Sequence, residues 1–245
     1  MSTDIKKLNI SGRIPKLVDK NGVEAFEVVL AKNKIHPKGS NVNMTMSPKL
    51  FPCEECRVKF KLCFDTDFPW NDSATHKVGG KLGGFQMGKG NAAASKYSTT
   101  GASYRLTFKK DWQAVGYFYP QLRKDFEGTD APWSLLDQHQ EFQDVSFVAA
   151  GVHVFAPNRK ATLHFAKGWN EIEMYTKLNT PGKYDGIMEL CVNGKRVRCN
   201  TVRYRYTSDV KINGFNIGAF FGGSTDMYAP SSDINLWYGD FEFSS

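Results

Sequence analysis

Apolar and polar residues alternate with a period of two along most of this chain. In residues 57–64 (RVKFKLCF) the even positions are apolar, while Arg57, Lys59 and Lys61 fall on the other face. Residues 103–110 (SYRLTFKK) alternate in the same way. This period is that of a β-strand with one face buried. Later segments repeat the pattern: VSFVAAGVHVFA, ATLHFA, NEIEMYTKL, GIMELCVNGKRVRC, TVRYRY, INGFNIGAFFGG and INLWYGDFEF.

Turn-forming residues separate these segments. Asn193-Gly194 lies between two alternating runs and predicts a tight hairpin. Helical periodicity is scarce, with residues 134–142 (SLLDQHQEF) as the best short candidate. No Pro- or Ser-rich linker and no repeat divides the chain. The pattern therefore predicts one all-β domain over residues 1–245, a β-sandwich or jelly roll, with the first 20 residues as a loosely attached arm.

Composition and charge narrow the function classes. A hydrophobic content of 41% supplies a core, and the lack of an 18-residue apolar run predicts no transmembrane helix. The start, MSTDIKKLNISGR, has no apolar segment typical of a signal peptide. That leaves a cytosolic protein, a virion-associated one, or an excised domain that acts on an extracellular cell wall. A net charge of +7 favours polyanionic partners, and the spread of Lys and Arg suits a lined groove.

The five cysteines predict no metal site. Cys53 and Cys56 have the spacing of half a zinc knuckle, but a second pair of ligands with suitable spacing is missing. An odd number of cysteines argues against a fully paired disulfide framework. We expect structural or free thiols, and neither a metal nor an organic cofactor.

Residues 83–89 (GGFQMGK) match G-x-x-x-x-G-K, the beginning of a nucleotide phosphate-binding loop. Such a loop needs Ser or Thr after the lysine and must join a strand to a helix. Here Gly90 follows Lys89, and no alternating strand–helix pattern surrounds it. We expect instead a glycine-rich loop that is structural or that has another function.

Three short patterns place polar groups together. Ser103 and Arg105 project from one face of their strand, and Tyr117 and Tyr119 from one face of the next. The connection between these strands is short enough for a hairpin. If the two faces coincide, they carry a cation, a hydroxyl and two phenols, with Lys81 added from the glycine loop. The alternative is an ordinary solvated sheet face, where Tyr and Arg are common.

This set of side chains suits β-elimination in a uronate polysaccharide. The C5 proton must leave beside a carboxylate while the C4–O bond breaks. Arg and Lys neutralise that carboxylate and stabilise the enolate-like transition state. A Tyr with cationic neighbours can act as base and then as acid.

The motifs GGKLGG, SYRL and YFY and the ending IGAFFGGSTDMYAPSSDINLWYGDFEF resemble polysaccharide lyase family 14, and among its members the Chlorella-virus enzymes most. The resemblance covers roughly Cys63 to the C-terminus. It implies a β-jelly roll whose concave groove holds a sugar chain. The active-site residues that it implies are Lys81, Ser103, Arg105, Tyr117 and Tyr119, without fixing which tyrosine is the base. Gly83 departs from the family's K-L-P-G pattern.

Four further residues are candidates for substrate binding. Gln86 can hydrogen-bond sugar hydroxyls or be a plain loop residue. Arg123 and Arg198 can meet successive carboxylates or be solvated, and Tyr204 can stack on a sugar ring or pack in the core.

The sequence thus predicts a monomeric lyase that cleaves glucuronan or alginate, for degradation of algal cell walls, with an acidic polysaccharide as its partner and neither nucleic acid nor membrane. A non-catalytic carbohydrate-binding module is the main alternative. A glycoside hydrolase would need two carboxylates across the groove, and a nucleic-acid-binding protein would show a steep salt dependence. The preferred uronate and the choice between internal and terminal cleavage stay open.

Overall fold

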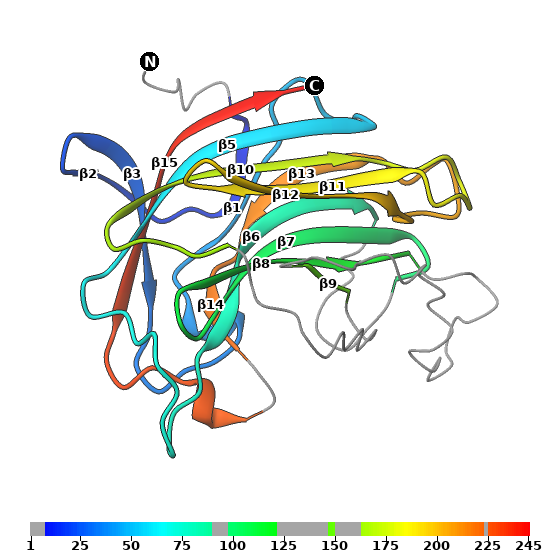
Figure 1. Cartoon of the computed structure of the whole chain (residues 1–245). Coiled ribbons are helices and arrows are strands. Elements are labelled where there is room, and N and C mark those ends of the chain that lie inside the picture. The colour runs from blue at the N-terminus through cyan, green and yellow to red at the C-terminus, as the bar shows by residue number, and fades with distance from the viewer. Residues whose placement is uncertain (1–7, 90–97, 122–146, 150–162, 223–224) are drawn as a thin grey trace.

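The computed structural model describes residues 8–89, 98–121, 147–149, 163–222 and 225–245. In this part of the chain two β-sheets pack face to face (Figure 1). The strands of the first sheet, sheet A, are in spatial order β1 (Ile10–Arg13), β4 (Asn43–Met46), β13 (Ile212–Ile217), β6 (Gly79–Gly88), β7 (Gly101–Lys109), β8 (Gln113–Tyr119) and β9 (Phe147–Ala149), with β14 (Phe220–Phe221) also paired to β6. Those of sheet B are β12 (Lys195–Val202), β11 (Gly186–Val192), β10 (Trp169–Lys177), β5 (Glu55–Phe64), β15 (Ile234–Ser244), β3 (Val23–Leu30) and β2 (Lys16–Lys20).

The predicted all-β sandwich is confirmed. The pairs are antiparallel except β8–β9, which is parallel. The Asn-Gly hairpin is present between β11 and β12, where Asn193 and Gly194 have φ values of 50° and 80°. These positive values fit a type I′ turn, whose twist matches that of the paired strands.

The alternating residues fill one core between the sheets. Val58, Phe60 and Leu62 of β5 are at most 4% exposed, as are Tyr104 and Leu106 of β7. Two buried tyrosines also cross the core to satisfy backbone carbonyls. The hydroxyl of Tyr104 donates to the carbonyl oxygen of Glu189 at 2.8 Å, and that of Tyr238 to the carbonyl oxygen of Leu82 at 2.9 Å. These hydrogen bonds tie sheet A to sheet B.

Three sequence-based expectations need correction or fall outside the described residues. Residues 10–20 are not a loose arm, because β1 pairs with β4 and β2 pairs with β3. The glycine-rich segment is not a loop but strand β6, paired with β7 and β13. The helix candidate at 134–142 lies outside the described residues. Within them, no helix has both the length and the apolar character that crossing a membrane requires.

Two 3₁₀ turns, Pro37–Gly39 and Asp226–Tyr228, bring residues from distant parts of the sequence to the end of sheet A where β14 lies. The backbone N–H of His36 donates to the carbonyl of Phe221, and that of Gly222 to the carbonyl of Gly79. Sheet A thereby gains a wall at this end.

Candidate active site

The hairpin of β7 and β8 sets the polar side chains of sheet A in two rows. Ser103 is directly opposite Tyr119, and Arg105 is directly opposite Tyr117. Residues that are opposite each other in an antiparallel pair project from the same face. The predicted coincidence of the two polar faces is therefore confirmed, and the face away from the core carries a hydroxyl, a guanidinium and two phenols.

This face is not the solvated surface that the alternative expected. Ser103 is 0% exposed, Arg105 8% and Tyr119 6%. A buried guanidinium is costly unless a counter-charge or hydrogen bonds stabilise it. Such burial favours a special role over an ordinary surface role.

Lys81 reaches the same face from β6. It is opposite Thr107 in the ladder, and a register shift between Lys81 and Gly83 marks a β-bulge, a feature that re-aims side chains. The Nζ atom of Lys81 donates a hydrogen bond of 2.6 Å to the phenolic oxygen of Tyr119. It also lies 4.5 Å from the centroid of the Tyr119 ring and 5.8 Å from that of Tyr117. The lysine is therefore held between the phenols.

No acid among the described residues forms an ion pair with the cations of this cluster. Burial, together with the adjacent positive charge of Arg105, lowers the pKa of Lys81 to about 7. Burial also lowers the pKa of Arg105, an effect that Tyr119 opposes. Burial and the neighbouring Tyr119 raise the pKa of Tyr117 well above its usual value. Neither Lys81 nor Arg105 forms an ion pair with a described residue, so an external anion would relieve both.

A cavity of about 580 Å³ opens beside Lys81, Tyr117 and Tyr119. It extends along the β7–β8 hairpin to the turn between the two strands. His36, which precedes the first 3₁₀ turn, Tyr228 of the second and Phe220 of β14 bound it on the other side. The remaining lining residues are His36, Asp72, Val78, Gly79, Gly80, Thr107, Phe108, Lys109, Lys110, Gln113, Phe220, Gly222 and Tyr228. Its volume is in the range of small-molecule sites.

Close backbone contacts explain why two positions of β6 are glycine. A Cβ atom on Gly84 would lie 2.0 Å from the carbonyl oxygen of Tyr104, and one on Gly80 would lie 2.1 Å from that of Phe220. Only glycine lets β6 approach its neighbours this closely. This packing keeps Lys81 between β7 and β14.

The further candidates have different outcomes. Gln86 of β6 is opposite Ser103 of β7 and is thus in the same row as Ser103 and Tyr119. Tyr204 is 0% exposed, packs against Phe118 and donates to the carbonyl of Ile187, so its expected role in sugar stacking is wrong. Arg123 lies outside the described residues.

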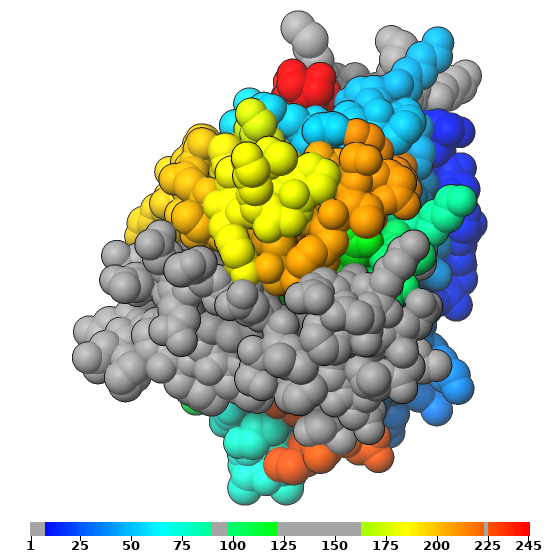
Figure 2. All heavy atoms as spheres, turned by 90° about the vertical axis from the view of Figure 1, so that its right-hand side faces the viewer, coloured from blue at the N-terminus to red at the C-terminus, as the bar shows by residue number. Residues whose placement is uncertain are grey.

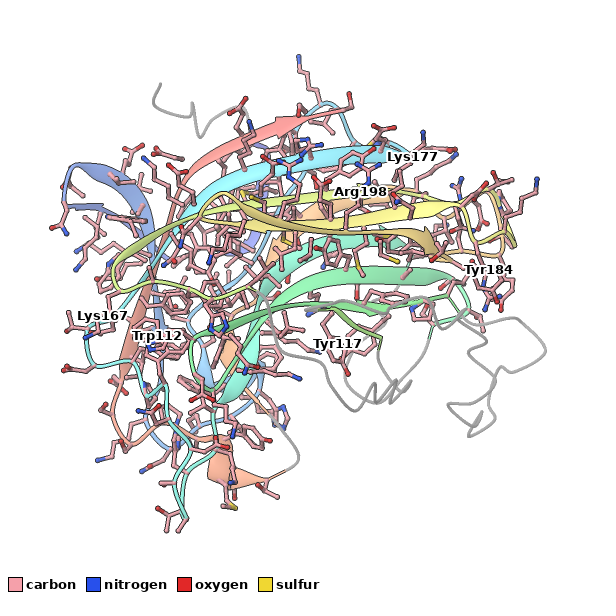
Figure 3. All side chains as sticks on the ribbon, in the orientation of Figure 1. Trp112, Tyr117, Lys167, Lys177, Tyr184 and Arg198 are labelled. Carbon is pink, nitrogen blue, oxygen red and sulfur yellow. The ribbon has the colours of Figure 1, made fainter. Side chains whose placement is uncertain are left out.

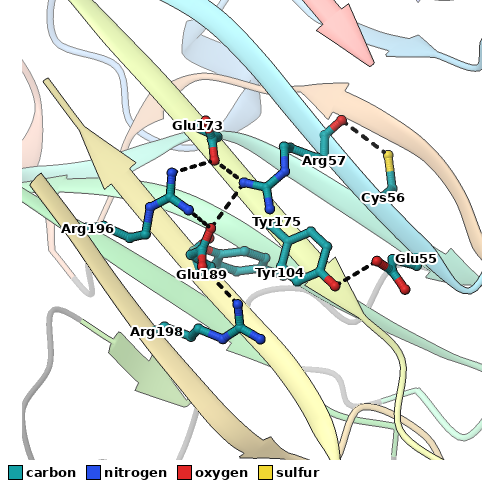
Figure 4. A network of polar contacts seen from close by, with 9 residues as sticks. All are labelled: Glu55, Cys56, Arg57, Tyr104, Glu173, Tyr175, Glu189, Arg196 and Arg198. Atoms are coloured by element: carbon teal, nitrogen blue, oxygen red, sulfur yellow. Dashed lines mark hydrogen bonds and ion pairs between the residues drawn. The ribbon is translucent and has the colours of Figure 1, made fainter. Parts of the chain in front are cut away.

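Arg198 is also remote from the cluster. It belongs to β12 of sheet B, whereas Tyr117 lies on sheet A (Figure 3). Its Nη1 lies 3.3 Å from Oε2 of Glu189, in a network that includes Arg57, Arg196 and Glu173 (Figure 4). Arg198 thus lies apart from the cluster, and its expected contact with a successive carboxylate stays a prediction.

Sequence reasoning missed the opposite wall of the cavity. His36, Asp72, Phe220 and Tyr228 are far apart in the sequence and come together only through the chain topology. No local pattern identifies them. Lys109 had a usable signal, since it continues the alternation of Ser103, Arg105 and Thr107.

Taken together, the sheet and its cluster define a class of protein: a β-sandwich with cations and phenols at a cavity, suited to an anionic substrate. Comparison with known families agrees with it. The family model of polysaccharide lyase 14 matches residues 20–241. The chain belongs to polysaccharide lyase family 14.

One curated relative and one solved structure are similar to this chain. Exolysin of Paramecium bursaria Chlorella virus 1 is 28% identical over 186 residues, which are 70% of this chain and 26% of exolysin. The chain thus spans about a quarter of that relative. The alginate lyase vAL-1 from Chlorella virus has a TM-score of 0.72 at 21% identity, covering 98% of this chain and 93% of vAL-1.

Two other structures share the fold. The marine alginate lyase of Aplysia kurodai has a TM-score of 0.69 at 19% identity, covering 97% of this chain and 89% of the other. The alginate lyase Aly36B, as a mutant in complex with alginate trisaccharide, has a TM-score of 0.64 at 18% identity, covering 91% and 82%. These likenesses show the fold of a two-sheet sandwich.

Proposed function

We propose that this protein cleaves uronate polymers of the alginate or glucuronan class by β-elimination at the cluster of Lys81, Ser103, Arg105, Tyr117 and Tyr119. The observation that carries the proposal is the 2.6 Å hydrogen bond from Lys81 to the phenolic oxygen of Tyr119, beside the buried Arg105. Alginate in the names of the solved relatives supports the substrate class. Degradation of algal cell walls is the role that we propose for this activity.

Lys81 and Arg105 act as the carboxylate-binding groups. The two cations lie next to each other, neither is paired with an acid among the described residues, and one sugar carboxylate can contact both. As the C5 proton leaves, negative charge spreads onto this carboxylate. Preorganised cations stabilise that charge more in the transition state than in the ground state, which accelerates the reaction.

Tyr119 acts as the base. An ammonium that donates to a phenolic oxygen favours the phenolate, and Lys81 donates to Tyr119. Tyr119 removes the C5 proton, the electron pair of the C5–H bond forms the C4=C5 double bond, and the C4–O bond breaks. Burial and the neighbouring Tyr119 raise the pKa of Tyr117, so Tyr117 keeps its proton. Either Tyr117 donates this proton to the leaving oxygen, or it positions the protonated Tyr119 while Tyr119 donates.

The direct test is to mix the protein with glucuronan or alginate and to follow the ultraviolet absorbance of the new double bond. We expect the rate to increase towards alkaline pH, because a phenol loses its proton there. A bound carboxylate keeps Lys81 charged above its pKa in the free protein. If no unsaturated product forms with any uronate polymer, the proposed function is wrong.

A further inference from the structure

The cavity beside the candidate active site contains a second cationic position at its far end. Lys109 follows Arg105 by four residues on the same face of β7, which at about 3.3 Å per residue places their Cα atoms roughly 13 Å apart. Both Lys109 and the cluster of Lys81, Tyr117 and Tyr119 line the one cavity. The distance exceeds what one carboxylate can bridge.

Two other lysines at this end of the cavity share one carboxylate, that of Asp72. Asp72 lies 3.7 Å from Nζ of Lys77 and 3.9 Å from Nζ of Lys110. Asp72 also accepts a hydrogen bond of 2.8 Å from the backbone N–H of Val78. His36, which also lines the cavity, comes from the opposite wall beside Phe220. Lys109 forms no ion pair with a described residue, whereas Lys77 and Lys110 share Asp72.

The position of Lys109 in the β7–β8 hairpin determines the face of sheet A from which its side chain projects. It is opposite Gln113 of β8 and Gly79 of β6, and its strand neighbour on the same face is Thr107. Gly79 has no side chain, and the ring of Tyr228 lies over it, where a Cβ would be 3.2 Å from Cε1; both residues line the cavity with Lys109. Lys109 is among the exposed side chains, although partial burial lowers its pKa. The ammonium thus lies at the rim, within reach of a ligand in the cavity.

We propose that Lys109 binds a second carboxylate of the same uronate polymer, so that the chain lies along β7 from the Lys81–Arg105 pair to the β7–β8 turn. This inference rests on the proposed function and adds the direction of the bound polymer. An acidic polymer carries a carboxylate on each uronate unit. A second cation in the same cavity therefore increases the affinity for substrates long enough to reach it. Lys109 is therefore a binding residue that contacts only the longer substrates, and it does not contact the reacting atoms.

The test is the dependence of kcat/KM on length for uronate oligomers of defined size. The wild-type protein should gain in kcat/KM once the oligomer reaches Lys109. In Lys109→Gln this gain should fall by about three- to tenfold, as expected for a partly exposed charge contact, with the change in KM and not in kcat. Lys109→Arg should keep the gain, and added salt should reduce it in the wild type.

The matched control is Lys59→Gln. Lys59 is an exposed lysine on β5 of sheet B, and its loss changes the net charge equally without touching the cavity. This variant should keep the length dependence of the wild type. If Lys109→Gln behaves like Lys59→Gln at every length while the wild type is active, this inference is wrong and the proposed function stands. If the wild type forms no product from any uronate polymer, the proposed function itself is wrong.

Discussion

Two groups of charged and aromatic side chains, one on each sheet, contain buried charge in opposite ways. On sheet B, Glu189 is 1% exposed and accepts from three arginines. On sheet A, Arg105 and Lys81 are buried or half-buried beside two tyrosines. Both groups combine guanidinium groups with phenol rings, yet their local charge differs.

The sheet B group supplies its own counter-ions. Nη1 of Arg196 lies 2.9 Å from Oε1 of Glu189 and Nη2 lies 3.0 Å from Oε1 of Glu173, while Arg57 contacts both carboxylates (Figure 4). Burial alone would lower the pKa of Arg57, but Glu173 and Glu189 raise it above its usual value. This group is complete without a ligand.

On the same sheet, backbone and side-chain hydrogen bonds also join neighbouring turns. Residues near 180 and 205 lie side by side on the face in Figure 2 (yellow and orange), where the N–H of Gly182 donates to the carbonyl of Arg205. Asn179 donates to that same carbonyl at 2.9 Å. The carbonyl of Arg205 is thus satisfied by two donors of the neighbouring turn.

The sheet A group differs because two cations are adjacent and the described residues supply no acid to pair with them. The pKa of Lys81 is about 7 because charge is disfavoured there. A fold retains such an arrangement at a cost in stability, which is typical of a functional site. The comparison teaches that charge imbalance, and not the presence of Arg and Tyr, distinguishes the candidate site.

The largest expected effect is that of Tyr119→Phe. Removal of this hydroxyl removes the proposed base and the acceptor of the Lys81 hydrogen bond, and kcat should fall by about 10²–10⁴. Polymer binding should persist, since Lys81 and Arg105 remain. Ultraviolet detection of the unsaturated product measures the first quantity, and calorimetric titration with the polymer measures the second. A variant with wild-type turnover would remove Tyr119 from the mechanism.

The next effect concerns stability, in Lys81→Met. The pKa of Lys81 is about 7 in the folded protein against 10.5 as the ordinary value, so between these pH values the unfolded chain binds more protons. Stability of the wild type therefore rises with pH across this window. Lys81→Met lacks the penalty, and near pH 7 it should be more stable than the wild type by about 1–3 kcal/mol. Its advantage should shrink towards pH 10.5, as urea unfolding at several pH values would measure.

The counterpart on sheet B is Glu189→Gln, which should change stability in the opposite direction. Its loss leaves Arg57, Arg196 and Arg198 without their shared carboxylate, and removal of one partner from a buried ion pair is destabilising by a few kcal/mol. Lyase activity of the folded variant should stay within about twofold of the wild type. If both variants lose stability near pH 7, the difference in charge balance between the two groups does not hold.

Much of the site follows from alternation along two strands. Ser103, Arg105, Tyr117 and Tyr119 were placed on one face from their spacing, because a strand repeats every two residues and a short turn fixes the register. The burial of this face did not follow, since alternation does not tell what covers a sheet.

The failures have equally physical reasons. Glycine is depleted in strands, so GGKLGG indicates a loop, and the close approach of Gly80 and Gly84 to neighbouring backbones appears only in three dimensions. Tyr204 has an alternating neighbourhood but lies wholly in the core. Pairing across the sandwich is set by long-range topology that no single segment encodes.

The smallest expected effect is that of Arg198→Gln, which tests whether the sheet B group takes part in binding. The Arg198 side chain is 44% exposed, and its contacts with Glu189 and Asn200 lie within its own sheet. An exposed ion pair contributes about 0.2–1 kcal/mol, so the free energy of unfolding should change by no more than that. KM for the polymer should stay within about twofold of the wild-type value, as steady-state kinetics would measure. A severalfold rise in KM would show that polymer contacts extend to sheet B, and that internal counter-ions do not exclude a surface from substrate binding.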